Sequence, residues 1–350
     1  MAFRVTHKRI IVSKFGGPEN LHLIEEEIPE PRAHEVRVKI LTAGVSFADI
    51  LMREGFHPET LLKRTPFSPG WDIVGIVDKV GEKLPRTSSW KIGDVVAALP
   101  IVGGYAQYLC VPSNQLVSVP SGVDSAEAVG IVLNYSTAYQ MLHRCAHIKS
   151  GESILVHGAA GGVGTALLQL GKLVGLEMYG TSSSSKEKLV SELGARPIDY
   201  KSVDFVQEIF RLTGNGVDVV FDGLGTKSLM RSYKTLCSGG RLMGYGFGST
   251  VKDRRHRAYQ IAPNIINWIK VLALNLIPDG RKVIPYSIQT LQRRKPAWFR
   301  EDLEILLNLL KNEKIKPIIA ARMPLNEAAR AQELLAAGSV TGKIVLICNS

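Results

Sequence analysis

The chain has 350 residues, 45% of them hydrophobic, and this length suits two domains that each bury their own core. Lysine and arginine outnumber aspartate and glutamate by 43 to 32, but no nucleic-acid-binding motif accompanies the mostly scattered basic residues. The composition therefore argues against a nucleic-acid partner, and leaves solubility, anionic substrates or an anionic membrane surface as reasons for the charge.

The cysteines and the first residues indicate the expected compartment. No two cysteines form a C-x-x-C pair, which excludes a four-cysteine zinc lobe and indicates reduced thiols; the four are Cys110, Cys145, Cys237 and Cys348. The opening sequence MAFRVTHKRIIV has no apolar signal-peptide region. We expect no export and a cytoplasmic location.

The first 129 residues are expected to form a mostly antiparallel β domain. Val36, Val38 and Ile40 alternate with charged residues, which is typical of a half-buried strand. Gly, Pro and Asp separate this strand from three others; the four segments are EVRVKIL, DIVGIVDKVG, DVVAAL and YAQYLCVP.

From about residue 130 strands and helices alternate, and this order predicts a doubly wound parallel sheet with helices on both faces. The predicted strands lie at residues 153–156, 176–181, 197–200, 217–222 and 241–246. Helices are expected after the first strand and at 186–193, 205–212 and 229–236.

Residues 248–297 interrupt this alternation. The basic run KDRRHR precedes the mainly apolar YQIAPNIINWIKVLALNLIP, whose asparagines and lysine argue against a membrane span, so we expect a buried or interfacial element. The last 50 residues predict an amphipathic helix, a second helix at 326–337 and the closing strand GKIVLI; the apolar positions of the amphipathic helix are Leu303, Ile305, Leu306 and Leu309.

The segment VHGAAGGVGT at 156–165 joins the first strand of the predicted parallel sheet to a helix. Glycines in such a turn let backbone N–H groups approach a ligand, and a helix N-terminus carries roughly half a positive charge, so the turn suits a dinucleotide pyrophosphate. Ala159 breaks the literal G-x-G-x-x-G fingerprint, and no lysine follows Gly164 as in a phosphate-binding P-loop. Close packing of the helix on the strand stays an alternative reading of these glycines.

Seven motifs in order between residues 45 and 346 resemble the zinc-free quinone oxidoreductase branch of the medium-chain dehydrogenase/reductase superfamily, and within it the synaptic vesicle membrane protein VAT-1 subgroup. They are VSFADILMREG, PFSPGWDIVGIVDKVG, GGYAQYLCVP, LNYSTAYQML, HGAAGGVG, PIDY and GKIVL. The resemblance implies a chaperonin-10-like catalytic domain from 1–129 and 298–350. It also implies an NADP-binding Rossmann domain from 130–297, an active site between the two, and a homodimer.

NADPH is the cofactor that the resemblance implies, and the residues support it independently. An NAD enzyme usually has an acidic residue at the end of the second strand, where this chain has Thr181 or Ser182, the first residues of TSSSSKEK. In the family, residues matching Ser182, Lys186 and Tyr200 hold the 2′-phosphate. The alternative for Ser182 to Ser185 is a flexible loop that caps the next helix.

The resemblance also implies the remaining site residues. Ser46, Asp49 and Tyr135 are the candidates to polarise or protonate the acceptor, although helix packing for Tyr135 and helix capping for Asp49 are alternatives. The expected cofactor contacts are Ser46, Thr137, Gly161, Gly162, Val163, Gly164, Thr181, Ser182, Lys186, Tyr200, Leu224, Tyr245, Phe247 and Lys343.

No metal is expected. Zinc relatives in the superfamily have cysteine where Ser46 or Phe47 stands and histidine where Trp71 stands. The family also commonly has asparagine at position 46 and tyrosine at position 56. Phe56 cannot donate a proton, so this departure weakens any transfer of quinone specificity.

The expected reaction is hydride transfer from NADPH to a quinone or another α,β-unsaturated carbonyl compound, because without a metal the acceptor must already be electron-poor. One alternative is a weakly active or inactive NADPH-binding protein that acts at a membrane or protein surface. Another is an enoyl-thioester reductase. The sequence leaves open the physiological acceptor and the oligomeric state, and any membrane contact is expected to be weak and peripheral.

Overall fold

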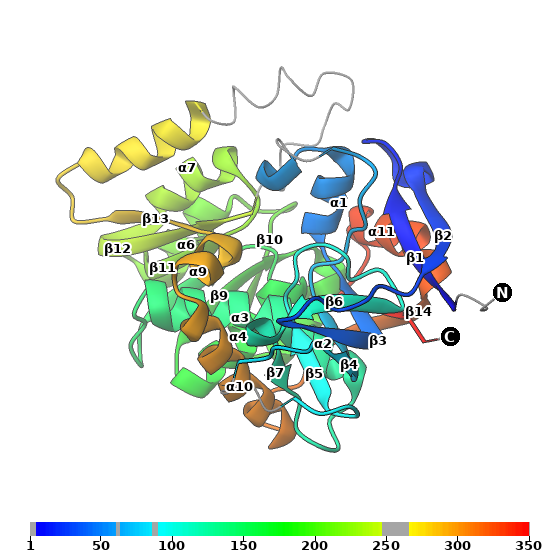
Figure 1. The fold of residues 1–350 in the computed structure, drawn as a ribbon. Helices are drawn as coiled ribbons and strands as arrows, with labels where there is room; N and C mark the ends of the chain where they lie inside the picture. Colours follow the sequence, from blue (N-terminus) through cyan, green and yellow to red (C-terminus); the bar gives the residue numbers. More distant parts are fainter. Residues whose placement is uncertain (1–4, 61–63, 86–89, 247–265, 350) are drawn as a thin grey trace. The chain divides into compact units, whose positions relative to one another are not determined.

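The computed structural model describes residues 5–60, 64–85, 90–246 and 266–349. The chain divides into two compact units (Figure 1): unit 1 combines Met1–Ser136 with Gln289–Ser350, and unit 2 is the continuous segment Thr137–Ile288. The expected boundaries between the catalytic and the NADP-binding domain, after residues 129 and 297, stay a prediction.

Unit 1 is built on a seven-stranded sheet in the order β14-β15-β3-β4-β5-β7, with β6 pairing to β3. Its strands are β3 (Glu35–Val45), β4 (Ile73–Val80), β5 (Val95–Ala98), β6 (Tyr108–Pro112), β7 (Val117–Ser118), β14 (Ile319–Pro324) and β15 (Lys343–Ile347). Every pairing is antiparallel except β14 with β15, which confirms the mostly antiparallel domain. A separate hairpin joins β1 (Thr6–Val12) to β2 (Leu21–Glu27).

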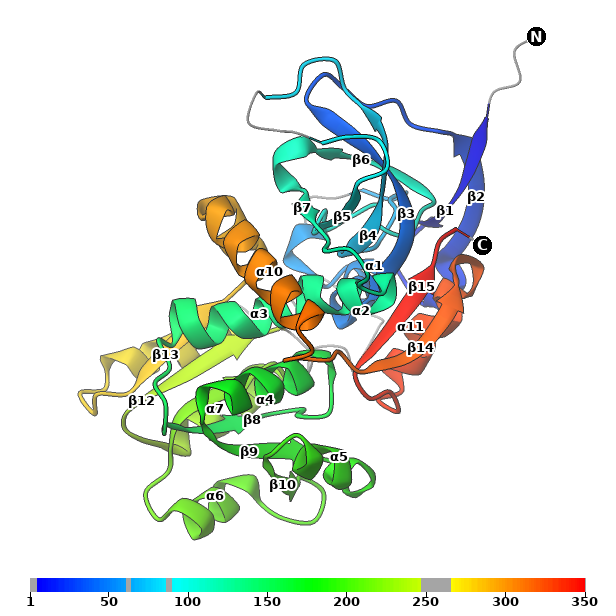
Figure 2. The ribbon, with the colours of Figure 1, turned by 90° about the horizontal axis from the view of Figure 1, so that it is seen from below.

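Two strands from the end of the chain complete this sheet. β15 pairs antiparallel with β3, opposite Thr42 to Val45, and β14 lies beyond it, as Figure 2 shows. Val36, Val38 and Ile40 of β3 are fully buried in the core, as their alternation predicts. Residues from both ends of the sequence therefore share one hydrophobic core.

The helices of unit 1 pack around this sheet. They are α1 (Phe47–Glu54), α2 (Ser125–Gly130), α9 (Ile288–Arg294), α10 (Pro296–Lys311) and α11 (Ala328–Ala336), with a π-helix at Ile131–Tyr135. Leu303 and Leu306 of α10 are buried as expected, but Ile305 is 43% exposed. Ile305 follows Leu303 by two residues, which is about 200° around the helix, so it faces the other side.

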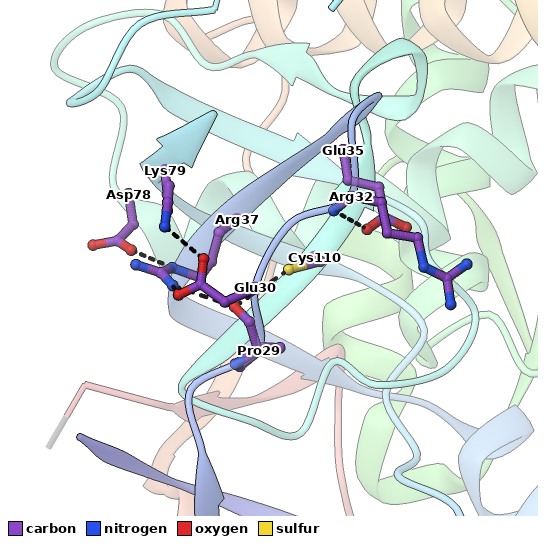
Figure 3. A network of polar contacts seen from close by, with 8 residues as sticks. All are labelled: Pro29, Glu30, Arg32, Glu35, Arg37, Asp78, Lys79 and Cys110. Atoms are coloured by element: carbon purple, nitrogen blue, oxygen red, sulfur yellow. Dashed lines mark hydrogen bonds and ion pairs between the residues drawn. The ribbon is translucent and has the colours of Figure 1, made fainter. Parts of the chain in front are cut away.

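A polar network on unit 1 links two neighbouring strands to the segment before β3 (Figure 3). Arg37 of β3 donates to Asp78 of β4 at 2.5 Å and pairs with Glu30 at 3.0 Å, while Lys79 pairs with the same Glu30 at 2.5 Å. The thiol of Cys110 on β6 donates to the carbonyl of Pro29 at 3.6 Å. Burial raises the pKa of this thiol to about 11, so it stays protonated at neutral pH.

Unit 2 is a six-stranded, fully parallel sheet in the order β10-β9-β8-β11-β12-β13. Its strands are β8 (Ser153–Val156), β9 (Glu177–Ser182), β10 (Arg196–Asp199), β11 (Val217–Asp222), β12 (Leu236–Tyr245) and β13 (Lys282–Tyr286). The first strand, β8, lies between β9 and β11, so the strand order reverses there. Ligands of such sheets bind at the carboxyl ends of the strands at this switch point.

The crossover helices of unit 2 lie close to the predicted positions. They are α4 (Gly162–Val174), α5 (Glu187–Glu192), α6 (Phe205–Thr213) and α7 (Thr226–Lys234). Before the first strand lie α3 (Ser136–Tyr139) and a π-helix at Gln140–Cys145. The helix expected to reach Leu236 was extended too far, because Leu236 pairs with Val217 and begins β12. Strand pairing there outweighs the local helical pattern.

The described part of the apolar stretch after the basic run, residues 266–278, is only partly buried. Residues 266–273 are helical, and Val271 is buried, but Ile269 is 61% and Leu276 85% exposed. Of the two alternatives expected for this element, the described residues do not support burial within this chain, and the interfacial one stays a prediction. No helix among the described residues is long and apolar enough to cross a membrane. The basic cluster Lys252 to Arg257 lies outside the described residues.

Candidate functional site

The glycine-rich turn directly follows β8 and begins α4. Gly158 has a left-handed φ of 63°, and its carbonyl accepts the N–H of Gly161 at 2.9 Å, which closes the turn. Gly161 is the N-cap of α4 in extended conformation, with no side chain to occupy the helix N-terminus. The sequence therefore leaves this end of the helix to be capped by a ligand.

Two glycines of the turn have different roles. A Cβ at Gly164 would lie 2.3 Å from the carbonyl oxygen of Gly158, so Gly164 is required for close packing of α4 on the turn. A Cβ at Gly161 would have one neighbour, at 3.2 Å, and one at Gly158 would have none within 4 Å. Close packing is therefore confirmed for Gly164, whereas ligand binding beside Gly161, where there is room, stays a prediction.

The first turn of α4 supplies the donors for an anion. The N–H groups of Gly162, Val163 and Gly164 lie in this turn, where helical N–H groups have no acceptor within the helix. The 13-residue helix adds the positive end of its dipole. Donors and field together favour a phosphate group at this point.

The carboxyl ends of β9 and β10 bring together two of the expected 2′-phosphate residues, Ser182 and Tyr200. The strands pair with Ser182 opposite Asp199, and the N–H of Tyr200 donates to the carbonyl of Ser182 at 3.3 Å. Lys186 ends a short 3-10 helix four residues after Ser182, and burial lowers the pKa of its ammonium group. A bound phosphate would favour the charged form of this lysine.

The serines after β9 do not cap the next helix. Neither Ser183, the N-cap residue of the 3-10 helix, nor Lys186, the N-cap residue of α5, makes a side-chain capping bond. The hydroxyls of Ser183 and Ser185 lie 3.1 Å apart. The capping alternative for this run is therefore wrong.

The loops after β11 and β12 carry further expected contacts. Leu224 is exposed just beyond β11, and Tyr245 ends β12 beside Gly223, where an added Cβ would lie 2.9 Å from its ring. Thr137 is buried in α3. Phe247 lies outside the described residues.

In unit 1, Ser46 and Asp49 form a capping box at the start of α1. The Ser46 hydroxyl donates to Oδ2 of Asp49 at 2.6 Å, and the Asp49 N–H donates back to that hydroxyl at 3.3 Å. The other carboxylate oxygen accepts the N–H of Gly70 at 2.9 Å. The capping alternative for Asp49 is therefore confirmed, and it does not remove Asp49 from the candidate site.

Asp49 is fully buried, and its burial raises the pKa of the carboxyl group to about 6. The bond from Ser46 opposes this rise, whereas the negative charge of Asp72 adds to it. The carboxyl group can therefore hold a proton closer to neutral pH than an ordinary aspartate.

Sequence reasoning missed Asp72, which the structure pairs with the expected cofactor residue Lys343. Nζ of Lys343 donates to Oδ2 of Asp72 at 2.7 Å, and both side chains are buried. Extending the β15–β3 register by one residue places Lys343 opposite Ser46. The acidic residue directly after Gly70 and Trp71 was the only available signal in the sequence.

Tyr135 ends the π-helix that follows α2, and such irregular turns are frequent at functional sites. Its hydroxyl is buried and has no hydrogen-bond partner among the described residues. Burial raises the pKa of the phenol, which therefore stays a neutral donor. Packing accounts for the ring but not for the unpartnered hydroxyl.

The described residues contain no candidate metal centre and no disulfide. Within residues 5–60, 64–85, 90–246 and 266–349, no group of three or more His, Cys, Asp or Glu could hold a metal ion. The four cysteines all lie in these ranges and form no disulfide.

The antiparallel sheet of unit 1 and the doubly wound sheet of unit 2, with a glycine turn at its switch point, define a dinucleotide-binding oxidoreductase architecture. The alcohol dehydrogenase GroES-like domain family matches residues 32–121, and the family described as zinc-binding dehydrogenase matches residues 193–346. The chain belongs to the medium-chain dehydrogenase/reductase superfamily and is an oxidoreductase.

Similar proteins within this superfamily include VAT-1 homologs and quinone oxidoreductases. The synaptic vesicle membrane protein VAT-1 homolog of Rattus norvegicus is 32% identical, over 97% of this chain and 83% of the relative. The quinone oxidoreductase of Pongo abelii is 30% identical over 97% of both chains. A mycobacterial protein solved in complex with NADPH is 28% identical, with a TM-score of 0.84 over 97% of this chain and 99% of that one.

Proposed function

We propose that the chain is an NADPH-dependent, zinc-independent reductase that transfers hydride to quinones or other α,β-unsaturated carbonyl compounds. The observation that carries the proposal is the carboxyl end of β9, which has no acidic residue and lies beside Tyr200 and close in sequence to Lys186. The quinone oxidoreductase relative and the NADPH-bound mycobacterial structure support the same reading.

The residues of unit 2 hold the cofactor in this proposal. The first-turn N–H groups of α4 bind the pyrophosphate, and Gly161 allows its close approach. Ser182, Lys186 and Tyr200 bind the 2′-phosphate, because an acid at this position would repel it. Leu224, Tyr245, Thr137 and Phe247 are proposed to contact other parts of the cofactor.

When bound, NADPH supplies the hydride. Hydride addition to a conjugated acceptor leaves an enolate or phenolate oxygen that takes up a proton. Tyr135 offers a neutral phenol for this step. Alternatively, the Ser46 hydroxyl gives its own proton to the product oxygen and takes a replacement from the protonated carboxyl group of Asp49, 2.6 Å away. A positioned donor contributes roughly 10² to 10⁴ in rate.

The test follows NADPH absorbance with a quinone, an enone and an acyl-thioester as acceptors. Consumption with the quinone or enone, unaffected by a metal chelator, is the expected result. Preference for the thioester would favour an enoyl-thioester reductase, and inactivity with all three would favour a binding protein.

Lys186→Ala is expected to weaken NADPH and leave NADH unchanged, since only NADPH carries the 2′-phosphate. Lys188→Ala is the matched control, because the Lys188 side chain is 90% exposed two residues further on. Equal affinity of the parent protein for both cofactors would contradict the NADPH assignment.

The proposal includes a cytoplasmic homodimer with at most weak peripheral membrane contact. The exposed side chains of Ile269 and Leu276 are the candidate contact surface of the dimer.

A further inference from the structure

Four buried polar side chains connect the carboxyl ends of the three central strands of unit 2. Thr181 lies near the end of β9, His157 directly follows β8, and Asp222 ends β11. The fourth, Ser232, lies on α7 and contacts Asp222. Each is at most 3% exposed. The glycine turn shares this edge of the sheet, so the four side chains lie directly behind the proposed pyrophosphate site.

The direction of each hydrogen bond follows from the carboxylate, which only accepts. Ser232 donates its hydroxyl proton to Oδ2 of Asp222 at 2.7 Å. Having no second proton, Ser232 must accept the bond from Nε2 of His157 at 3.0 Å. His157 is therefore protonated on Nε2, and burial lowers its pKa, which favours the neutral ring.

With Nε2 carrying the proton, Nδ1 of His157 is an acceptor. The Thr181 hydroxyl lies 3.1 Å from this nitrogen and donates its only proton to it. The ring also packs edge-on against Phe205, with centroids 4.7 Å apart, which holds its orientation. The Thr181 hydroxyl thus has no proton left for a phosphate oxygen.

Thr181 instead holds the start of the glycine turn. Its hydroxyl oxygen accepts the N–H of Gly158 at 3.2 Å, and its carbonyl accepts the N–H of Ala159 at 3.0 Å. Gly158 in turn accepts the N–H of Gly161, the N-cap of α4. The orientation of the threonine hydroxyl is therefore passed directly to the backbone proposed to meet the pyrophosphate.

At the other end of the network, Oδ1 of Asp222 accepts the N–H of Leu224 at 2.8 Å. The same chain of bonds therefore holds the turn after β8 and the loop after β11, which lie on either side of the switch point.

We propose that Thr181 and His157 are positioning residues for the pyrophosphate-binding turn, and that the Thr181 hydroxyl is not a ligand of the 2′-phosphate. This rests on the proposed function, because it names how unit 2 orients the cofactor. Recognition of the 2′-phosphate is then left to Ser182, Lys186 and Tyr200. Thr181 contributes to the part of the site that NADPH and NADH share.

The first experiment compares Thr181→Val, which removes the hydroxyl at similar size, with Thr181→Ser, which keeps it. Fluorescence titration of Thr181→Val is expected to show both NADPH and NADH weakened by the same factor, about three- to tenfold, with their ratio unchanged. Thr181→Ser is expected to bind both like the parent. Lys186→Ala is the contrast, because it changes the ratio.

A second pair of variants tests the histidine. His157→Asn keeps an acceptor near the position of Nδ1, whereas His157→Leu removes it. Both cofactors are expected to bind more weakly to His157→Leu than to His157→Asn, again with an unchanged ratio. Equal binding by the two variants would contradict the role of Nδ1.

A ligand-free measurement separates this inference from the proposed function. Hydrogen–deuterium exchange of residues 157–161 is expected to be faster in Thr181→Val and close to the parent rate in Thr181→Ser. If the parent bound neither dinucleotide but exchange followed this pattern, the proposed function would fail while the positioning of the turn stood. Unchanged exchange in Thr181→Val, or a selective loss of NADPH over NADH, would overturn the inference.

Discussion

Lys343 and Asp72 form a buried ion pair across 271 positions of the sequence, with Nζ and Oδ2 2.7 Å apart. The second oxygen of Asp72 is buried without a hydrogen-bond partner among the described residues. An added Cβ at Gly44 would lie 2.3 Å from Cε of Lys343 and 2.5 Å from Oδ2 of Asp72. The lysine charge is therefore already balanced, which limits its value as an independent anion ligand.

Removing one partner of this pair should strongly destabilise the protein. Lys343→Met leaves a buried carboxylate uncompensated, and we expect a loss of about 3–5 kcal/mol in the free energy of unfolding, measured with urea. The double variant Asp72→Asn, Lys343→Met should lose less. Arg322→Met, which breaks the exposed pair with Asp124, is the control and should cost at most about 1 kcal/mol. A similar cost for the buried and exposed pairs would contradict this prediction.

The two glycines of the turn should separate stability from binding. Gly164→Ala places a Cβ against the Gly158 carbonyl and should lower the melting temperature, with a cost of roughly 1–3 kcal/mol. Gly161→Ala should cost less than about 1 kcal/mol but weaken NADPH, because the added methyl lies where the pyrophosphate approaches. Calorimetry and cofactor titration together test the pair, and full cofactor affinity in Gly161→Ala would show that this approach is not needed.

Asp49 should give stability a pH dependence of defined sign. Its pKa is about 6 when folded, above the ordinary 3.8, so the folded state binds more protons between these values. The stabilisation that protonated Asp49 provides is fully present below pH 3.8 and is lost as pH rises through about 6. Asp49→Asn does not titrate, so the difference in unfolding free energy between parent and variant should change over this range and be constant above it. A difference that is flat from pH 4 to 7 would show that Asp49 titrates normally.

The exposed apolar residues after residue 265 should test the proposed homodimer. Ile269→Asn should leave the melting behaviour of the monomer nearly unchanged, since this side chain is mostly exposed, but should weaken self-association measured by sedimentation. Leu23→Asn on β2, also exposed, is the matched control. If neither variant altered the association of a dimeric parent, the contact surface would lie elsewhere.

The fold was predictable because its signals are local. Alternation in β3 and the repeated strand–helix order of unit 2 come from burial of one face of each element, and such patterns appear within ten residues or so. The helix end at Leu236 was missed because it depends on pairing with Val217, about twenty positions away. The choice between a buried and an interfacial element around Ile269 stayed open, because composition alone does not tell which apolar residues find a partner.

The candidate site likewise has a part that local sequence reveals and a part that only the fold brings together. Ser46 and Asp49 are three positions apart, and the glycine turn is one continuous segment, so both could be read from the sequence. The bond between His157 and Ser232 spans 75 positions, and only the parallel sheet brings the two together. Inward orientation of the Thr181 hydroxyl is a property of that network, and no local pattern reveals it.

The pairing of β15 with β3 also bears on the order in which the protein can form on the ribosome. Unit 2 is one uninterrupted segment, so all of its strands have been synthesised by residue 288. The edge of β3 next to Ser46 must wait for residues 343–347, made about fifty residues later. Until then the nascent amino-terminal sheet presents an unpaired strand edge. Such an edge can pair with another chain and aggregate, or it can be bound by a chaperone.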